Sequence, residues 1–430
     1  MTGTQRLSFG STTMLFSPTR EAALQRLHDF VPRAGRAYAN SRNYDDGPPD
    51  SEARQNVSQL SPWLHAGIIS ETEVLDAVLA QHGPHAAEKF VAEVFWRIYF
   101  KGYLEQRPSI WPAYCEQRDK ALGQLDANSG LKTAYDQAVG GSTGIEAFDH
   151  WARELVQTGY LHNHARMWFA SIWIFTLKLD WTLGADFFLR HLMDADAASN
   201  TLSWRWVGGL HTKGKTYLAR PDNIARYTAN QPSGPLSADG LAHEAPALEE
   251  AADHQKQALD LPQSDAADLH GADYALILHD EGACHMAMNL PHPPKLVLGM
   301  TRPEARSPLP VGETARNFAR SAVETGVDQA GDAFGCKAKL LGEGEGLQQS
   351  LGQAGLQTVA FSYLPTGWTR DALLPELMGL PDAVNIVPLL SEVEHATWPY
   401  AKAGFFGVKK KIESILGEVG IDGSSLDAAE

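Results

Sequence analysis

The chain has 430 residues, of which 43% are hydrophobic, and it contains three cysteines. This length can form two domains, each with its own core. The cysteines are far apart and odd in number, which fits a reducing cytosol and excludes a four-cysteine iron–sulfur cluster within one chain. We find neither a signal peptide nor a run of about 18 apolar residues, so we expect a cytoplasmic protein without membrane contact.

The net charge of −16 is unevenly distributed along the chain. Residues 1–235 carry 23 basic and 24 acidic side chains, whereas residues 236–270 carry 1 and 8. Residues 271–430 carry 12 and 20. The first part is therefore nearly neutral, and the acidity belongs to residues 236–430.

Helical periodicity predominates before residue 235. Ser70 and Glu73 have the spacing of a capping box at the start of a helix. Further helices are predicted at residues 85–108, 144–159, 163–184 and 185–199. The sequence therefore predicts an all-α domain over residues 1–235.

Residues 236–270 are rich in Ala, Asp and Glu and are predicted to be an acidic linker, with a short helix at 247–259. Short apolar runs come after it, separated by helical segments. Strands are predicted at residues 274–279, 295–300, 358–364 and 383–390. Alternating strands and helices indicate an α/β domain with a parallel, Rossmann-like sheet over residues 271–430.

Two segments of the first domain have polar side chains suited to chemistry. In residues 56–70, Ser58, Gln59 and Ser61 precede or begin a helix, and such a helix start either attracts a phosphate or is simply capped. In residues 194–206, Asp194 and Asp196 are candidates for acid–base catalysis, for metal binding or for a buried ion pair.

The segment "TGYLHNHARM" (158–167) contains His162 and His164. On a helix, residues two apart point in different directions, so the two imidazoles are not expected to share a metal. The tryptophans of this region, including Trp181, Trp204 and Trp206, are more often packing residues than electron carriers.

Five segments in series resemble the FAD-binding helical domain of the photolyase/cryptochrome family, over residues 38–220. They are "YANSR" (38–42), "VSQLSPWLHAGIIS" (57–70), "EVFWRIYF" (93–100), "TGYLHNHARM" (158–167) and "HLMDADAASNTLSWRW" (191–206). Each motif is weak alone, but their order and spacing agree with the family.

The resemblance implies an FAD site and a role for each matching residue. Arg166 and Asp194 correspond to a buried ion pair beside the isoalloxazine, and Asn200 to the residue that faces flavin N5. A neutral carboxamide at that position favours fully reduced flavin. The implied cofactor-binding residues are Tyr38, Ser58, Gln59, Leu60, Ser61, Arg97, Asn163, Arg166, Asp194, Asp196 and Asn200.

The resemblance also implies a pocket for a cyclobutane pyrimidine dimer flipped out of UV-damaged DNA. Glu93 corresponds to the acid that stabilises the dimer, and it is expected to be a protonated donor in an apolar pocket. Trp96 and Trp206 correspond to apolar walls, with Asn163 and Met167 beside them. Arg42 and His164 correspond to contacts with DNA phosphates.

Three features depart from the family pattern. Trp204 and Trp181 match the first two members of an electron-transfer triad, but the third has no clear counterpart, and Trp111 is preferred over Trp173. Tyr160 stands where the family has tryptophan. The α/β domain comes after the helical domain here, whereas in ordinary photolyases it precedes it, so it is either a permuted antenna domain or an appended one.

Three functions are consistent with these patterns, as hypotheses. The first is FAD-dependent, light-driven repair of pyrimidine dimers, a lyase activity, with the antenna chromophore unidentified. The second is a cryptochrome-like photoreceptor whose acidic C-terminal region binds a protein partner, which the acidity and domain order favour. The third is a flavoprotein that keeps the fold but acts as a reductase or binding module.

Overall fold

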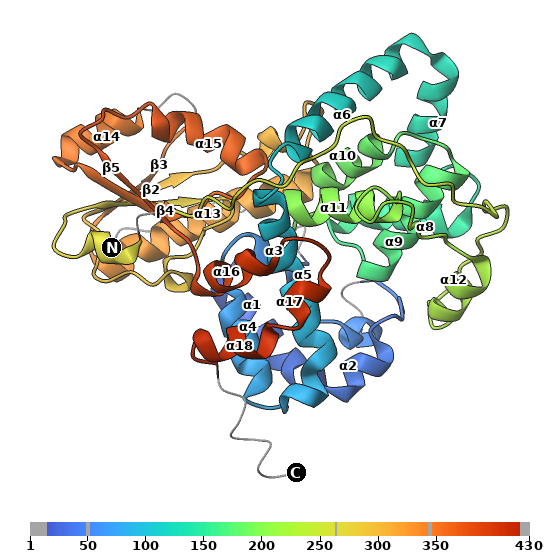
Figure 1. The fold of residues 1–430 in the computed structure, drawn as a ribbon, viewed down its shortest axis with the longest axis horizontal. Coiled ribbons are helices and arrows are strands. Elements are labelled where there is room, and N and C mark those ends of the chain that lie inside the picture. The colour runs from blue at the N-terminus through green and yellow to red at the C-terminus, as the bar shows by residue number, and fades with distance from the viewer. Residues whose placement is uncertain (1–14, 49–51, 263–264, 343–345, 422–430) are drawn as a thin grey trace, which may run out of the picture.

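The structure is a computed structural model that describes residues 15–48, 52–262, 265–342 and 346–421. Two parts lie side by side in Figure 1, a helical part and a sheet covered by helices. The helices of the first part are α1 Arg20–Phe30, α2 Arg36–Ser41, α3 Ser61–His65, α4 Glu71–Leu79, α5 Pro84–Glu105, α6 Ile110–Ala127, α7 Ser129–Val139, α8 Glu146–Thr158, α9 Asn163–Ser171, α10 Trp181–His191, α11 Ala197–Val207 and α12 Pro221–Tyr227.

Local sequence signals account for several of these boundaries. The predicted capping box is present at α4, where the Ser70 hydroxyl accepts from the Glu73 amide and the Glu73 carboxylate accepts from the Ser70 amide. At the helix of residues 61–65, Leu60 is the N-cap and Ser61 is the first residue, so Ser61 begins the helix and does not cap it.

The single helix predicted over residues 163–184 is wrong. A π-helical turn at Ile172–Thr176 follows α9, and Lys178 then adopts a φ of 56°, which ends the helix. The break is stabilised by Asp180, whose carboxylate caps α10 by accepting from the Thr182 amide at 2.8 Å. The Asp180 carbonyl also accepts from the Trp173 indole at 2.9 Å.

Five strands form one parallel sheet in the order β3-β2-β1-β4-β5. They are β1 Ala275–His279, β2 Leu296–Met300, β3 Lys337–Leu340, β4 Thr358–Ser362 and β5 Asn385–Leu389. The connecting helices are α13 Glu313–Phe334, α14 Leu347–Ala354 and α15 Trp368–Met378. The central strands are fully buried apolar runs, as parallel sheets require.

The edge strand β3 escaped prediction because its sequence, "KAKL", is exposed at every position. Its backbone pairs with β2 from Leu296–Lys337 to Gly299–Leu340. Exposed lysines are typical of a sheet edge, where they discourage pairing with other chains.

The short helix predicted at residues 247–259 is also wrong. Residues 236–262 of the linker run over the helical part without a helix, and a short 3-10 helix, Ala266–Leu269, comes only near the end of the linker. Glu250 makes a bidentate ion pair with Arg205 of α11, at 2.6 and 2.7 Å. The Leu248 amide donates to the Gly208 carbonyl. These partners outside the segment replace the hydrogen bonds that a local helix would form.

The last described residues lie against the helical part. After β5, helices α16 Glu392–Thr397 and α17 Phe406–Lys409 return to lie against α5, and α18 Ile412–Glu418 packs on α16. Trp398 is fully buried, and a Cβ on Gly102 of α5 would lie 2.5 Å from its ring. One hydrophobic core therefore includes residues of both parts. In the part of the chain that is described, no helix combines the length and apolarity needed to cross a membrane.

Candidate flavin and substrate cavity

A cavity of about 590 Å³ opens among α2, α3, α5, α9 and α11. All predicted cofactor-binding residues line it: Tyr38, Ser58, Gln59, Leu60, Ser61, Arg97, Asn163, Arg166, Asp194, Asp196 and Asn200. So do the predicted substrate-facing residues Glu93, Trp96, Met167 and Trp206, together with Arg42, His164 and Trp204. The structure thus brings separate sequence motifs to one space, within the typical size range of ligand sites.

The loop before α3 is shaped to present backbone amides. Gln59 has a φ of 56°, and Leu60 after it is in the right-handed region. When successive residues adopt left-handed and right-handed backbone conformations, their amides point to one side and form a concave anion site. Arg26 of α1 fixes the loop from behind by donating to the Ser58 carbonyl at 2.8 Å. This loop can hold a pyrophosphate.

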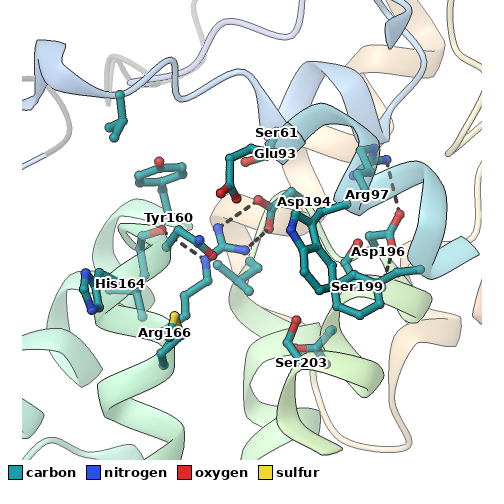
Figure 2. A pocket seen from close by; sticks show the side chains of 18 of the residues that line it. Ser61, Glu93, Arg97, Tyr160, His164, Arg166, Asp194, Asp196, Ser199 and Ser203 are labelled. Atoms are coloured by element: carbon teal, nitrogen blue, oxygen red, sulfur yellow. Dashed lines mark hydrogen bonds and ion pairs between the residues drawn. The ribbon is translucent and has the colours of Figure 1, made fainter. Parts of the chain in front are cut away.

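The predicted pair of Arg166 and Asp194 is present at the floor of the cavity. Figure 2 shows the two side chains facing each other, with bidentate hydrogen bonds of 2.8 and 3.1 Å. Burial raises the pKa of Asp194, but the guanidinium outweighs burial and holds that pKa below its usual value. Arg166 also donates to the Leu161 carbonyl at 3.0 Å, so the pair is fixed in orientation.

A second ion pair lies deeper. Arg97 of α5 is 3.2 Å from Asp196 and 2.9 Å from Glu71. Asp196 is the N-cap of α11 and accepts from the Ser199 amide at 2.6 Å. Burial opposes ionisation of Asp196, but Arg97 outweighs it and lowers the pKa. Asp196 is therefore held by α5 and caps α11 in place.

Asp196 also belongs to a buried cluster with His65 and Glu281, whose ligand atoms lie within 4.8 Å of one another. Both nitrogens of the His65 ring have no hydrogen-bond partner among the described residues. Lys101 lies 3.9 Å from Glu281, and Arg97 contacts Asp196. Because these two cations already face the carboxylates, a divalent metal is disfavoured, and the cluster joins the helical part to the end of β1.

Glu93 points into the cavity, as Figure 2 shows, and makes an ion pair with Arg42. The two side chains are 31% and 29% exposed. In the structure the Glu93 carboxyl group is paired with the Arg42 guanidinium, and the protonated donor expected for Glu93 stays a prediction. The sequence separation of 51 residues hid the pairing.

The two predicted apolar walls lie in different surroundings. Trp96 stacks on Phe405 at 4.1 Å between ring centroids, and Trp206 stacks on Tyr217 at 5.7 Å. Phe405 was missed by sequence reasoning because it belongs to the C-terminal segment. The Asn200 amide nitrogen donates to the Ala185 carbonyl at 2.8 Å, which leaves its carboxamide oxygen as the group free to face the cavity.

The two histidines of "TGYLHNHARM" have packing and capping roles. His162 is buried and caps α9, its ring nitrogen accepting from the His164 amide at 3.1 Å. The His164 ring stacks on Trp168 at 4.3 Å, and burial lowers its pKa to about 4. A neutral, stacked His164 favours packing over an ionic contact with a phosphate.

The predicted electron carriers are all buried, and they form two groups. Trp204 contacts Trp173, with 6.2 Å between ring centroids. Trp181 contacts Tyr114 at 5.7 Å, and Tyr114 contacts Trp111 at 5.3 Å. Tyr114 was missed, although its place one helical turn after Trp111 is a usable signal.

Residues 90–234 match the family model of the FAD binding domain of DNA photolyase. The chain is 34% identical over 195 residues to a deoxyribodipyrimidine photo-lyase from Streptomyces griseus, covering 42% of this chain and 41% of the relative. It is 31% identical over 218 residues to a photo-lyase of the same description from Thermus thermophilus, covering 50% and 49%. The chain thus spans about two-fifths to half the length of these relatives.

Two solved structures also match part of the chain. A bacterial class III photolyase from Agrobacterium tumefaciens is 30% identical, with a TM-score of 0.36 over 49% of this chain and 40% of the other. A cryptochrome from Synechocystis is 25% identical, with a TM-score of 0.39 over 49% and 43%.

The match to the family model identifies an FAD-binding domain. The cavity agrees with it, because its loop presents backbone amides and its arginines are paired with carboxylates. Residues 90–234 of this chain are thus similar to the FAD-binding domain of the photolyase/cryptochrome family. FAD is the cofactor that the domain takes. The residues present fit it, because the loop supplies amides for phosphates and the Arg166–Asp194 pair is oriented at the cavity floor.

Proposed function

We propose that this protein repairs cyclobutane pyrimidine dimers in DNA in a light-driven reaction that uses FAD. The observation that carries the proposal is that one cavity contains both the cofactor residues and the dimer-facing residues Glu93, Trp96 and Trp206. The two curated relatives described above, both named deoxyribodipyrimidine photo-lyase, support the same activity.

FAD, which the loop at residues 58–61 and the Arg166–Asp194 pair would hold, would supply light-driven one-electron chemistry that is redox-neutral overall. The protein residues bind and orient the substrate. Trp96 and Trp206 offer apolar faces to two bases that have left the duplex. Asn200 presents a carboxamide oxygen, which can accept a hydrogen bond without adding a charge.

The ion pair between Arg42 and Glu93 makes the access of Glu93 to the substrate depend on DNA. In the free protein each neutralises the other. A DNA phosphate is a competing partner for the guanidinium. When Arg42 turns to a phosphate, the Glu93 carboxyl group is released from the ion pair and can contact the dimer.

The test is repair of an oligo(dT) that contains dimers. The reduced, FAD-loaded protein is illuminated, and recovery of pyrimidine absorbance is followed. Glu93→Ala should slow repair by about a hundredfold, as the loss of one aligned donor does elsewhere. Glu93→Gln keeps an amide donor and should retain more activity. His85→Ala, an exposed change on the same helix, is the control.

The photoreceptor alternative rests on the net charge of −16, which repels DNA overall. It predicts a protein that is yellow and photoreducible but whose wild-type chain restores no pyrimidine absorbance. In that case Glu93→Ala and wild type would be equal in the repair assay, and a search for a protein partner of the acidic C-terminal region would be the next experiment.

A further inference from the structure

A short C-terminal segment, residues 398–411, is basic in an otherwise acidic region. Its sequence, "WPYAKAGFFGVKKK", contains four lysines and no acidic residue. These lysines are four of the 12 basic residues after position 270, where there are 20 acidic ones. The segment is therefore a local positive site on a negative background.

The segment is fixed against the helix that carries the cavity wall. The Tyr99 hydroxyl donates to the Ala403 carbonyl at 2.6 Å, and the Arg107 guanidinium donates to the Lys402 carbonyl at 2.8 Å. Phe405 stacks on Trp96 with an angle of 16° between the rings. Figure 1 shows α17 beside α5. Phe405 thus packs against the ring of Trp96, which lines the cavity.

The outer side of the segment is open to solvent. Phe406 is 66% exposed, an unusual exposure for a large apolar side chain, and the Lys410 ammonium lies 4.5 Å from its ring centroid. Lys409 pairs with Glu88 at 3.0 Å. Within the described parts of the chain, no carboxylate lies in ion-pair range of Lys402, Lys410 or Lys411.

We propose that this segment is a DNA-contact surface: Lys402, Lys410 and Lys411 bind phosphates of the strand beside the cavity, and Phe406 packs against a base or sugar. The inference rests on the proposed repair function and names the part of the chain that holds the substrate. Charge complementarity identifies the occupant, since unpaired lysines beside an exposed aromatic ring match a nucleic acid strand.

This surface offsets the unfavourable overall charge. A protein of net charge −16 has little general attraction for DNA, so a local patch must provide both affinity and orientation. The position of the patch, one stacked ring away from Trp96, directs a bound strand toward the cavity mouth.

The experiment uses the full FAD-loaded chain and a labelled oligo(dT) that contains a single dimer. Binding of wild type, Lys410→Glu/Lys411→Glu and Lys337→Glu/Lys339→Glu is measured by fluorescence anisotropy at several salt concentrations. The second double variant is matched in charge, and its two lysines are exposed on the edge strand β3, away from α5. Flavin absorbance and circular dichroism confirm that both variants are folded.

The first double variant should bind at least about tenfold more weakly at low salt, and the slope of log affinity against log salt should fall by about 1 to 2. The β3 variant should bind like wild type. Phe406→Ser should weaken binding without changing the slope. Under repair conditions, Lys410→Glu/Lys411→Glu should raise KM for the oligonucleotide and leave kcat unchanged.

Other results overturn the proposal in distinguishable ways. If wild type repairs dimers and both double variants bind DNA as tightly as wild type, the repair function stands and the contact surface lies elsewhere. If both double variants weaken binding equally, only net charge matters, and the assignment of this segment is wrong. If wild type neither binds nor repairs DNA, both proposals are wrong.

Discussion

Asp194 is the residue on which the cavity floor depends. Its carboxylate is buried and takes two hydrogen bonds from Arg166. Asp194→Asn leaves the guanidinium without its counterion in a place where water reaches it only through the cavity. Removal of one partner from a buried pair should cost about 3 kcal/mol of unfolding free energy, and FAD retention should fall with it.

Urea unfolding and the flavin retained after gel filtration measure this prediction. Asp119→Asn is the matched control, because Asp119 pairs with Arg118 but is 58% exposed. Its change in stability should stay within about 0.5 kcal/mol, as for other surface pairs. Equal effects of the two substitutions would show that the Arg166–Asp194 pair does not hold the cavity.

Asn200 lines the cavity and is proposed to face the cofactor. The side-chain nitrogen of Asn200 donates a hydrogen bond to the Ala185 carbonyl. Asn200→Asp therefore removes that hydrogen bond and places a carboxylate at the cavity wall. A negative charge there disfavours added electrons. The reduction potential of the bound flavin should fall by roughly 30 mV, about 1.4 kcal/mol for two electrons.

Potentiometric titration of the bound flavin measures the shift, and Ser203→Ala, which changes another residue lining the same cavity, is the control. A potential that is unchanged in Asn200→Asp would place Asn200 away from the redox-active ring.

At the scale of elements, α6 and α10 carry a row of aromatic rings. Trp181 of α10, Tyr114 and Trp111 are in successive contact, and Trp111 donates to Asp371 of α15 at 2.6 Å. If this row delivers electrons to the cofactor, Trp181→Phe should slow photoreduction at least about tenfold. Repair by chemically reduced protein should stay unchanged, because that reaction does not use the row.

The control is Trp398→Phe, a buried tryptophan whose indole nitrogen has no hydrogen-bond partner among the described residues. Photoreduction under constant light with an added reductant is the readout. A rate equal to wild type in Trp181→Phe would exclude this row and direct attention to Trp173, which contacts Trp204.

Sequence reasoning worked best where the signal was local. The Ser70 capping box, four of the strands and the motifs around the cavity are short patterns whose side chains act within a few residues. The same reasoning failed where the decisive partner lay far along the chain. The sequence of residues 247–259, taken by itself, predicts a helix, but Glu250 forms an ion pair with Arg205 instead. The ion pair of Glu93 with Arg42 joins residues that are 51 positions apart.

The C-terminal segment shows the limit most clearly. The sequence around Phe405 does not indicate that its ring stacks on Trp96, which lies 309 positions earlier in the chain. That contact results from the packing of α16 and α17 on α5. Tertiary packing of this kind has no local signature, because either ring could bury itself against any apolar surface.

At the scale of the whole molecule, the two parts meet at a buried group of charges. Glu281 comes just after β1 and lies 3.9 Å from Lys101 and 4.0 Å from His65, both on helices of the first part. Burial raises the pKa of Glu281 from 4.5 to about 7, despite the attraction of Lys101. The charge on this one carboxyl group therefore affects how firmly the sheet is attached.

The raised pKa makes the stability contribution depend on pH in a definite direction. Between pH 4.5 and about 7 the folded chain holds a proton on Glu281 that the unfolded chain has released. The free energy of unfolding therefore contains a term that is fully present below pH 4.5 and is lost as pH rises to about 7. Its full size is roughly 3 kcal/mol.

Glu281→Gln mimics the protonated carboxyl group at every pH and should abolish this term. We expect the stability of wild type relative to Glu281→Gln to fall by roughly 3 kcal/mol between pH 4.5 and pH 7.5, measured by urea unfolding at matched ionic strength. Subtraction removes the terms of the other carboxylates, such as Asp194, which the two proteins share. Glu413→Gln, on the exposed face of α18, should give a flat difference. A flat difference for Glu281→Gln as well would mean that the carboxylate is solvated in the folded chain and that its charge does not affect how firmly the two parts are held together.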